Sequence, residues 1–186
     1  MADRAPRAAG VCLVMAAVRR AEVSDIAALS RIRIDTWQAT YRGIIPDAVL
    51  DALDPETTRA RWQRTLADGA GRGLFVYVVE DHDGVEGYVG VGPETGAVSG
   101  HPGEVYMLYV HPTCHGRGYG KLLLRQGLAD LTERGLLPAL VWVLHDNPAR
   151  AFYEHMGAHF LTSRQVEIGQ TLLEDGFSFP ARPGGA

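Results

Sequence analysis

Three glycines, Gly116, Gly118 and Gly120, alternate with other residues in the stretch YVHPTCHGRGYGKLLL, which passes from an apolar segment into a leucine-rich one. Glycine lets the backbone approach a ligand closely, and the first turn of a helix carries N–H groups without partners. A strand-to-helix junction of this kind binds anions, phosphate in particular. The spacing therefore predicts a phosphate-binding loop, and a tight turn without a ligand is the alternative.

The positions of these glycines exclude two common phosphate-binding motifs. The nucleoside triphosphate loop, GxxxxGK followed by Ser or Thr, needs a glycine where His115 stands and a hydroxyl where Leu122 stands. The dinucleotide fingerprint GxGxxG needs its third glycine at Lys121 or Leu123. The loop therefore matches neither a nucleoside triphosphate nor a nicotinamide dinucleotide.

The same stretch fits the pattern V-x-P-x-x-[QR]-x-x-G-x-G, with His115 in place of the usual Gln or Arg. It resembles motif A of the GNAT superfamily, the acyl-CoA-dependent N-acetyltransferases, and the resemblance extends over residues 17–179. The resemblance implies that backbone N–H groups of residues 116–121 bind the CoA pyrophosphate at a helix N-terminus, where the helix dipole adds to the attraction. It also implies a mixed α/β fold, with a central, mostly antiparallel sheet whose fourth and fifth strands splay apart between flanking helices.

The resemblance assigns cofactor-binding roles on both sides of the loop. The strand before the loop is expected to pair with the pantetheine amides like an added β-strand. Further along, DNPARAFYEHMGA resembles the family element N-x-x-A-x-x-F-Y-E-x-x-G. The expected acetyl-CoA-binding residues are Leu108, Tyr109, Val110, His115, Gly116, Arg117, Gly118, Tyr119, Gly120, Lys121, Asn147 and Tyr153.

Acetyl transfer needs two proton movements, and the resemblance offers residues for each. An amine must be neutral when it attacks a thioester, and a carboxylate takes its proton directly or through water. Glu104 opens the strand before the loop and is the expected base, with Glu80, Asp81 and a water chain as alternatives. Tyr153 is expected beside the CoA sulfur as the general acid for the departing thiolate, and a core aromatic at helical spacing is the alternative.

Recognition of the acceptor is expected from the N-terminal helices, again by resemblance. The segment DTWQATYRGIIPD holds the candidate substrate-binding residues Trp37, Tyr41 and Arg42. Core packing is the alternative for Trp37.

Metal and nucleophile signals are weak. His155 and His159 have metal-ligand spacing, but Gly157 lies between them and should end their helix. Cys114 lies beside the loop without the His–Asp pattern that activates a nucleophile. We therefore expect no metal, and direct transfer in a ternary complex rather than a covalent intermediate.

The hydrophobic pattern indicates which elements position these residues, in the order β-α-α-β-β-β-α-β-α-β-β. We expect a first helix capped by Ser24, and two or three short helical segments over 36–66, where glycine and prolines interrupt the pattern. A hairpin around DHDG and the strand EVYMLYV lead to the glycine loop. A helix ending near Gly135, the strand ALVWVL, a helix within 147–157 and two strands within 165–179 complete the order.

Length and composition indicate one globular domain. The chain has 186 residues, of which 46% are hydrophobic and 22% charged. The domain is expected over 17–180, after a flexible extension at 1–16 and before a disordered tail at 181–186. Met15 is an alternative start to Met1.

Charge and cysteine content limit the partners. A net charge of −4 gives no general attraction to nucleic acid or to anionic membranes. Two cysteines without a CxxC pair indicate a reducing, cytoplasmic location. A homodimer is expected only by resemblance.

Together these features predict an acetyl-CoA-dependent N-acetyltransferase in which a primary amine, from a small molecule or from a peptide or protein, attacks directly. A domain that binds acyl-CoA without turnover, as a sensor or regulatory module, is the alternative.

Overall fold

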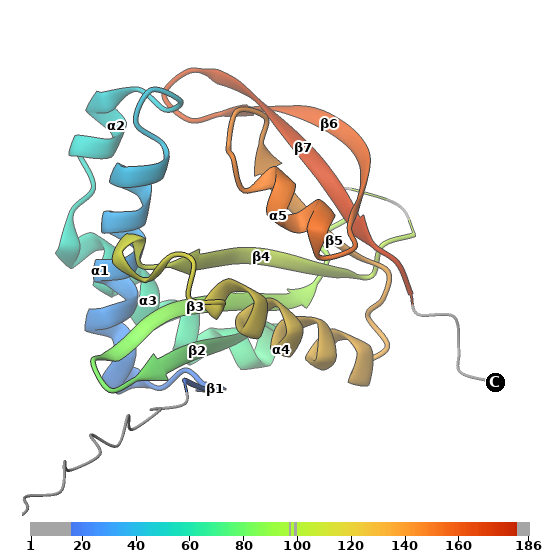
Figure 1. The fold of residues 1–186 in the computed structure, drawn as a ribbon, viewed down its shortest axis with the longest axis horizontal. Helices are drawn as coiled ribbons and strands as arrows, with labels where there is room; N and C mark the ends of the chain where they lie inside the picture. Colours follow the sequence, from blue (N-terminus) through green and yellow to red (C-terminus); the bar gives the residue numbers. More distant parts are fainter. Residues whose placement is uncertain (1–15, 97, 99, 182–186) are drawn as a thin grey trace, which may run out of the picture.

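A computed structural model describes residues 16–96, 98 and 100–181 (Figure 1). Apart from Ala16 and Ala181, the expected extension and tail lie outside the described residues. The elements in chain order are β1 (Ala17–Arg20), η1 (Val23–Asp25), α1 (Ile26–Thr40), α2 (Asp47–Asp51), α3 (Pro55–Gly69), η2 (Ala70–Arg72), β2 (Phe75–Asp81), β3 (Gly84–Pro93), β4 (Gly103–Val110), η3 (Pro112–Cys114), α4 (Tyr119–Glu133), β5 (Ala139–Leu144), α5 (Arg150–His155), β6 (His159–Glu167) and β7 (Thr171–Phe179). Within this part of the chain, no helix combines the length and the apolar character needed to cross a membrane.

The strands form one sheet in the order β1-β2-β3-β4-β5-β7-β6. Every neighbouring pair is antiparallel except β4 and β5. That parallel pair holds for only a short distance, from Gly103 opposite Ala139 to Val105 opposite Val141. Beyond these pairs the two strands, both fully described, form no ladder with each other, so they separate as expected. The mixed α/β fold with a mostly antiparallel sheet is confirmed.

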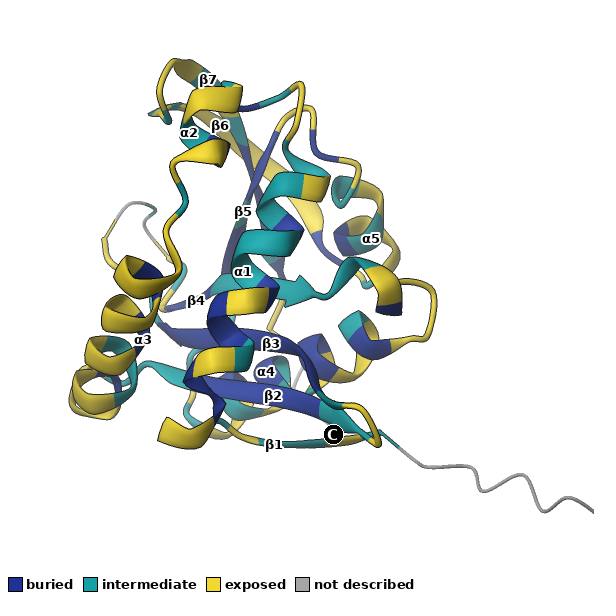
Figure 2. Ribbon diagram, turned by 90° about the vertical axis from the view of Figure 1, so that its left-hand side faces the viewer, coloured by how far each residue is buried: buried dark blue, intermediate teal, exposed yellow. Residues whose placement is uncertain are grey.

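Helices cover both faces of the sheet. On one face α4 packs its apolar side against β2, β3 and β4. On the other face α1 and α3 pack together over β3 and its neighbours. Figure 2 shows β2 and β3 buried in the middle of the molecule and the outer side of α3 exposed. The fully buried anchors of the two layers include Leu123, Leu124 and Leu131 from α4, and Leu29 and Ile32 from α1. Each such leucine or isoleucine contributes roughly 1.5–3 kcal/mol by leaving water.

The helices over 36–66 are interrupted as expected. This range holds the end of α1, the helix α2 and most of α3, separated where glycine and prolines interrupt the pattern, although α3 has 15 residues and is longer than expected. Pro55 lies at the start of α3, where its missing N–H costs nothing, and the Asp54 carboxylate accepts from the Thr57 N–H at 2.7 Å. Ser24 does not cap α1, because it lies in the η1 turn and Asp25 takes the cap position.

The remaining elements follow the pattern more closely. The hairpin of β2 and β3, the strand β4 and the end of α4 before Gly135 lie where predicted. β6 begins at His159, earlier than the predicted 165. The sequence pattern missed its first residues because they are exposed and lack the apolar alternation of a half-buried strand. The arrangement places the end of α1, the start of α4 and the start of α5 around the point where β4 and β5 separate (Figure 1).

Candidate active site

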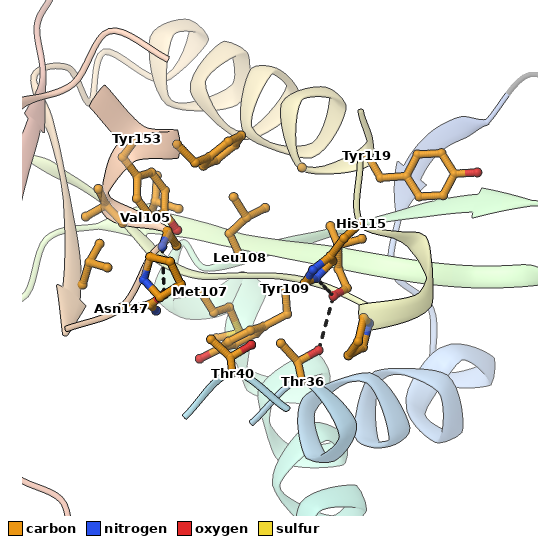
Figure 3. Close-up of a pocket in the computed structure, with 18 of the residues that line it drawn as sticks. Thr36, Thr40, Val105, Met107, Leu108, Tyr109, His115, Tyr119, Asn147 and Tyr153 are labelled. Carbon is orange, nitrogen blue, oxygen red and sulfur yellow. Dashed lines mark hydrogen bonds between the residues drawn. The ribbon is translucent and has the colours of Figure 1, made fainter. Parts of the chain in front are cut away.

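A cavity of about 750 Å³ lies where β4 and β5 separate. Its walls come from the end of α1, residues 105–110 of β4, the loop before α4, the middle of β5 and the beginning of α5 (Figure 3). The lining residues on which the chemistry depends are Thr36, Thr40, Tyr41, Tyr109, His115, Gly116, Gly118, Gly120, Lys121, Asn147 and Tyr153. One continuous space thus runs from the glycine loop to the two strands.

The glycine loop, at the N-terminus of α4, has the backbone geometry of an anion-binding loop. Gly116 and Gly118 have φ of +78° and +84°, which L side chains rarely adopt, and Gly118 is the residue before the helix begins. Gly120 is different, because a Cβ there would meet Phe152 at an ordinary 3.5 Å. The first turn of the 15-residue helix α4 has backbone N–H groups without partners inside the helix, and Tyr119, Gly120 and Lys121 of this turn line this end of the cavity.

The charged residues of the loop take different directions. Lys121 is exposed and lines the cavity. Arg117 does not line it, and its Nη1 lies 3.6 Å from Asp81. Tyr119 belongs to the cavity lining, but its ring points away from the other lining residues (Figure 3), and its hydroxyl donates to the same carboxylate at 2.6 Å. This hydrogen bond lowers the pKa of Asp81, so the carboxylate stays charged and holds both neighbours.

His115, the residue outside the usual pattern, joins the loop to the strand. Its Nε2 lies 2.9 Å from the carbonyl oxygen of Val110, the last residue of β4. The Thr36 hydroxyl donates to the same carbonyl at 3.4 Å. His115 therefore positions the end of β4 as well as lining the cavity (Figure 3).

Asn147 is buried in the loop before α5 and lines the cavity. Its Oδ1 accepts from the Ala149 N–H at 2.9 Å, and its Nδ2 donates to the Tyr41 hydroxyl at 3.3 Å. The amide thus orders the turn into α5 and reaches the end of α1.

Tyr153 lies on α5 and lines the cavity, and it is 6% exposed. Burial, with a smaller effect from Tyr109, raises the pKa of the Tyr153 hydroxyl well above its usual range. At neutral pH the hydroxyl therefore keeps its proton and can donate it.

Of the three expected acceptor residues, only Tyr41 lines the cavity. Trp37 lies behind it, with its ring centroid 5.3 Å from that of Tyr41, and its Nε1 donates to the Tyr109 hydroxyl at 3.0 Å. Arg42 pairs with Asp47 at 3.1 Å and with Asp51 at 2.9 Å, outside the cavity lining. Trp37 thus supports the wall instead of forming it.

Glu104 does not line the cavity, although the next two residues of β4 do. Burial raises the pKa of its carboxyl to about 7, with a further increase from Glu94 and an opposing effect from Arg164. Such a group changes charge near neutral pH. The alternative bases are engaged elsewhere, since Glu80 accepts from Arg19 at 2.8 Å and Asp81 holds the loop.

The sequence analysis missed the residues of α1 that face the cavity. Thr36, Ala39 and Thr40 line it beside Tyr41. Residues three and four positions apart lie on the same face of a helix. The small side chains at these positions were therefore the signal in the sequence that could have predicted a helix face beside a cavity.

Three potential metal ligands, Glu86, His111 and Cys114, lie together with their ligand atoms within 4.8 Å of one another. Glu86 lies 3.6 Å from the Arg31 guanidinium, and His111 lies 3.1 Å from Asp35. Two of the three side chains therefore have charged neighbours of their own, and the absence of a metal stays a prediction.

Comparison with known proteins identifies the family. The model of the acetyltransferase (GNAT) family matches residues 28–158, which contain the glycine loop, β4, β5 and Tyr153. The chain belongs to the GNAT acetyltransferase family. A relative from Bacillus subtilis (strain 168), the uncharacterized N-acetyltransferase YuaI, is 30% identical over 168 residues, covering 89% of this chain and 94% of that protein.

Solved structures of other GNAT proteins share the fold. One is the PaiA N-acetyltransferase of Thermoplasma acidophilum in complex with coenzyme A, with a TM-score of 0.69 at 15% sequence identity. The match covers 89% of this chain and 99% of the PaiA chain. Another is the putative acetyltransferase yncA of Salmonella typhimurium with its cofactor acetyl-CoA, with a TM-score of 0.66 at 22% sequence identity. The match covers 92% of this chain and 96% of the yncA chain. At these identities the likeness establishes the GNAT fold.

Proposed function

We propose that this chain transfers the acetyl group of acetyl-CoA to a primary amine. The observation that supports this most is the continuity of the cavity, from the glycine loop at the N-terminus of α4 to Tyr153 beside the separated strands. The two structural neighbours with CoA or acetyl-CoA bound are consistent with it.

The residues present fit acetyl-CoA. The N–H groups of the first turn of α4 and the Lys121 ammonium would bind the pyrophosphate, since both favour negative charge. The part of β4 after Val105 does not pair with β5, so its backbone groups on that side are available to the pantetheine amides. Acetyl-CoA supplies the activated acyl group, and the chain supplies the site that holds it.

The cavity walls would serve the two proton movements. The attacking amine must lose a proton, and Glu104 is the candidate base, acting through water because it does not line the cavity. Tyr153 would donate its proton to the departing thiolate and regain one from solvent afterwards. Holding both reactants in one cavity supplies much of the remaining acceleration.

A domain that binds acyl-CoA without turnover is the second candidate. The position of Glu104 outside the cavity lining favours it, because no carboxylate then touches the amine directly.

Two measurements test these proposals in order. Acetyl-CoA and CoA should raise the unfolding temperature of the chain, whereas NADH and ATP should not. Absence of any CoA effect would contradict the proposed site. Release of free thiol from acetyl-CoA with a panel of primary amines then separates the two candidates: release supports the enzyme, and binding without release supports the sensor.

A further inference from the structure

Glu86, His111 and Cys114 form a cluster where the start of β3 meets the end of β4. A ligand atom of each residue lies within 4.8 Å of the ligand atoms of the other two. Backbone hydrogen bonds also join them, since the His111 N–H donates to the Glu86 carbonyl at 2.8 Å and the Cys114 N–H donates to the His111 carbonyl at 2.9 Å. We call these three residues the Glu-His-Cys cluster.

The Glu86 carboxylate is buried with too few partners. The residue is 6% exposed, and its Oε2 accepts no hydrogen bond from the described residues. The Arg31 guanidinium lies 3.6 Å from this oxygen, beyond hydrogen-bonding distance, and its Nη2 donates to the Val85 carbonyl at 3.1 Å instead. A buried carboxylate oxygen without a donor is costly, so it indicates that a further group binds there.

The histidine and the cysteine of the cluster are oriented by their neighbours. The His111 Nε2 lies 3.1 Å from the Asp35 carboxylate, which leaves Nδ1 as the nitrogen for a metal. A carboxylate on the far nitrogen is the usual arrangement of a metal-binding histidine, because it fixes the tautomer and the ring orientation. Nδ1 lies 2.7 Å from the Thr113 hydroxyl, and that hydroxyl lies 3.7 Å from the sulfur of the buried Cys114.

The three ligand types select the metal. A thiolate, an imidazole and a carboxylate are the groups that bind Zn²⁺, whereas Mg²⁺ and Ca²⁺ take oxygen ligands. The ligand atoms of a tetrahedral zinc site lie about 3.3–3.8 Å apart. Atoms within 4.8 Å of one another therefore need only small side-chain movements to bind the ion.

The charges also match a divalent cation. One thiolate and one carboxylate neutralise Zn²⁺, so a buried ion at this place leaves no net charge. The two charged neighbours, Arg31 and Asp35, have opposite signs and offset each other.

We propose that the Glu-His-Cys cluster binds one zinc ion, with water or the Thr113 hydroxyl in the fourth position. Cys114 loses its proton on binding, because the thiolate is the ligand. The ion joins β3 to η3, the turn just before Gly116, and thereby holds the start of the glycine loop in place. This role is structural and goes beyond the proposed function. It also goes against the sequence-based prediction of no metal, which rested on motifs along the chain.

The first test measures zinc affinity on the full chain without an affinity tag, stripped of metal by a chelator that is then removed. Titration with zinc chloride against a chromophoric chelator should give one ion per chain, with a dissociation constant of about 1 μM or lower. Cys114→Ser and Glu86→Gln should each weaken binding at least about 100-fold, because each removes a ligand. Asp35→Asn should weaken it about tenfold, since Asp35 only orients His111.

Two variants are matched controls. Cys12 is the other cysteine of the chain and lies outside the described residues. His82 belongs with Asp81 and Asp83 to a second group of potential ligands, in which His82 and Asp83 are exposed. Cys12→Ser and His82→Gln should bind zinc like the wild type. No zinc binding by the wild type, binding that survives Cys114→Ser, or binding that is lost in either control would overturn the proposal.

A spectroscopic test needs no substitution in the core. Cobalt(II) bound in place of zinc should give a thiolate-to-metal charge-transfer band and the intense visible bands of a tetrahedral site. In Cys12→Ser, Cys114 is the only cysteine, so the charge-transfer band identifies it as the ligand even if the core variants do not fold. Absence of that band in Cys12→Ser would also overturn the proposal. None of these readouts depends on acetyl transfer, so the zinc site and the proposed function can fail separately.

Discussion

Asn147 and Tyr41 are joined by a hydrogen bond although 106 residues separate them in the chain. The Asn147 amide donates to the Tyr41 hydroxyl at 3.3 Å and thereby connects the loop before α5 to the end of α1. The bond lies at the boundary between the space expected to hold acetyl-CoA and the space expected to hold the acceptor. It links the two halves of the site.

We expect Asn147→Ala to lower the free energy of unfolding by about 1–3 kcal/mol, because the Ala149 N–H and the Tyr41 hydroxyl both lose a partner in a buried position. Urea unfolding measures this. With Tyr41→Phe in a double-mutant cycle, the coupling should be about 0.5–1.5 kcal/mol, and strictly additive effects would show that the bond contributes nothing.

Gly118→Ala and Gly120→Ala should behave differently. Gly118→Ala forces a side chain onto a φ of +84° and should cost roughly 1–2 kcal/mol of stability, with weaker binding of acetyl-CoA. Gly120→Ala introduces only an ordinary contact with Phe152 and should fold like the wild type. Calorimetry with acetyl-CoA and thermal unfolding measure both, and equal stability of the two variants would refute the role assigned to Gly118.

Tyr153→Phe should lower kcat about 100-fold and leave acetyl-CoA affinity within about twofold, because it removes a proton donor but keeps the buried ring. Steady-state thiol release and calorimetry give the two quantities. Unchanged turnover would remove Tyr153 from the mechanism.

Glu104→Gln should change how stability depends on pH. The carboxyl binds its proton more tightly in the folded chain, with a pKa of about 7, than in the unfolded chain, where it is near 4.5. Its favourable contribution is therefore complete below about pH 4.5 and is lost as the pH rises through 7. At pH 8.5 the Gln variant should be more stable than the wild type by about 1 kcal/mol, after allowance for solvent screening.

The control for this effect is Glu133→Gln on the exposed side of α4, which should show no such pH dependence. Urea unfolding at pH 5 and pH 8.5 measures both variants. A Glu104→Gln variant that is equally destabilised at the two pH values would contradict the raised pKa.

The sequence by itself determined the features that depend on neighbours along the chain. Gly116 and Gly118 take positive φ values because of local backbone conformation, so their spacing predicted the loop and the start of α4 correctly. The hairpin of β2 and β3 follows from alternating apolar residues around a tight turn, which is equally local. The separation of β4 and β5 was predicted through family resemblance, since strand order is not a local property.

Only the tertiary structure decided which side chains share the cavity. Trp37 stands one turn before Tyr41 on the helix pattern, yet Trp37 supports Tyr109 from behind while Tyr41 faces the cavity. Glu104 is next in sequence to a lining residue but lies outside the lining, because it pairs with Leu140 of β5 in the part of β4 that comes before the two strands separate. The hydrogen bonds of Trp37 with Tyr109 and of Asn147 with Tyr41 join residues 72 and 106 positions apart, and such contacts form only when the sheet brings α1, β4 and the loop before α5 together.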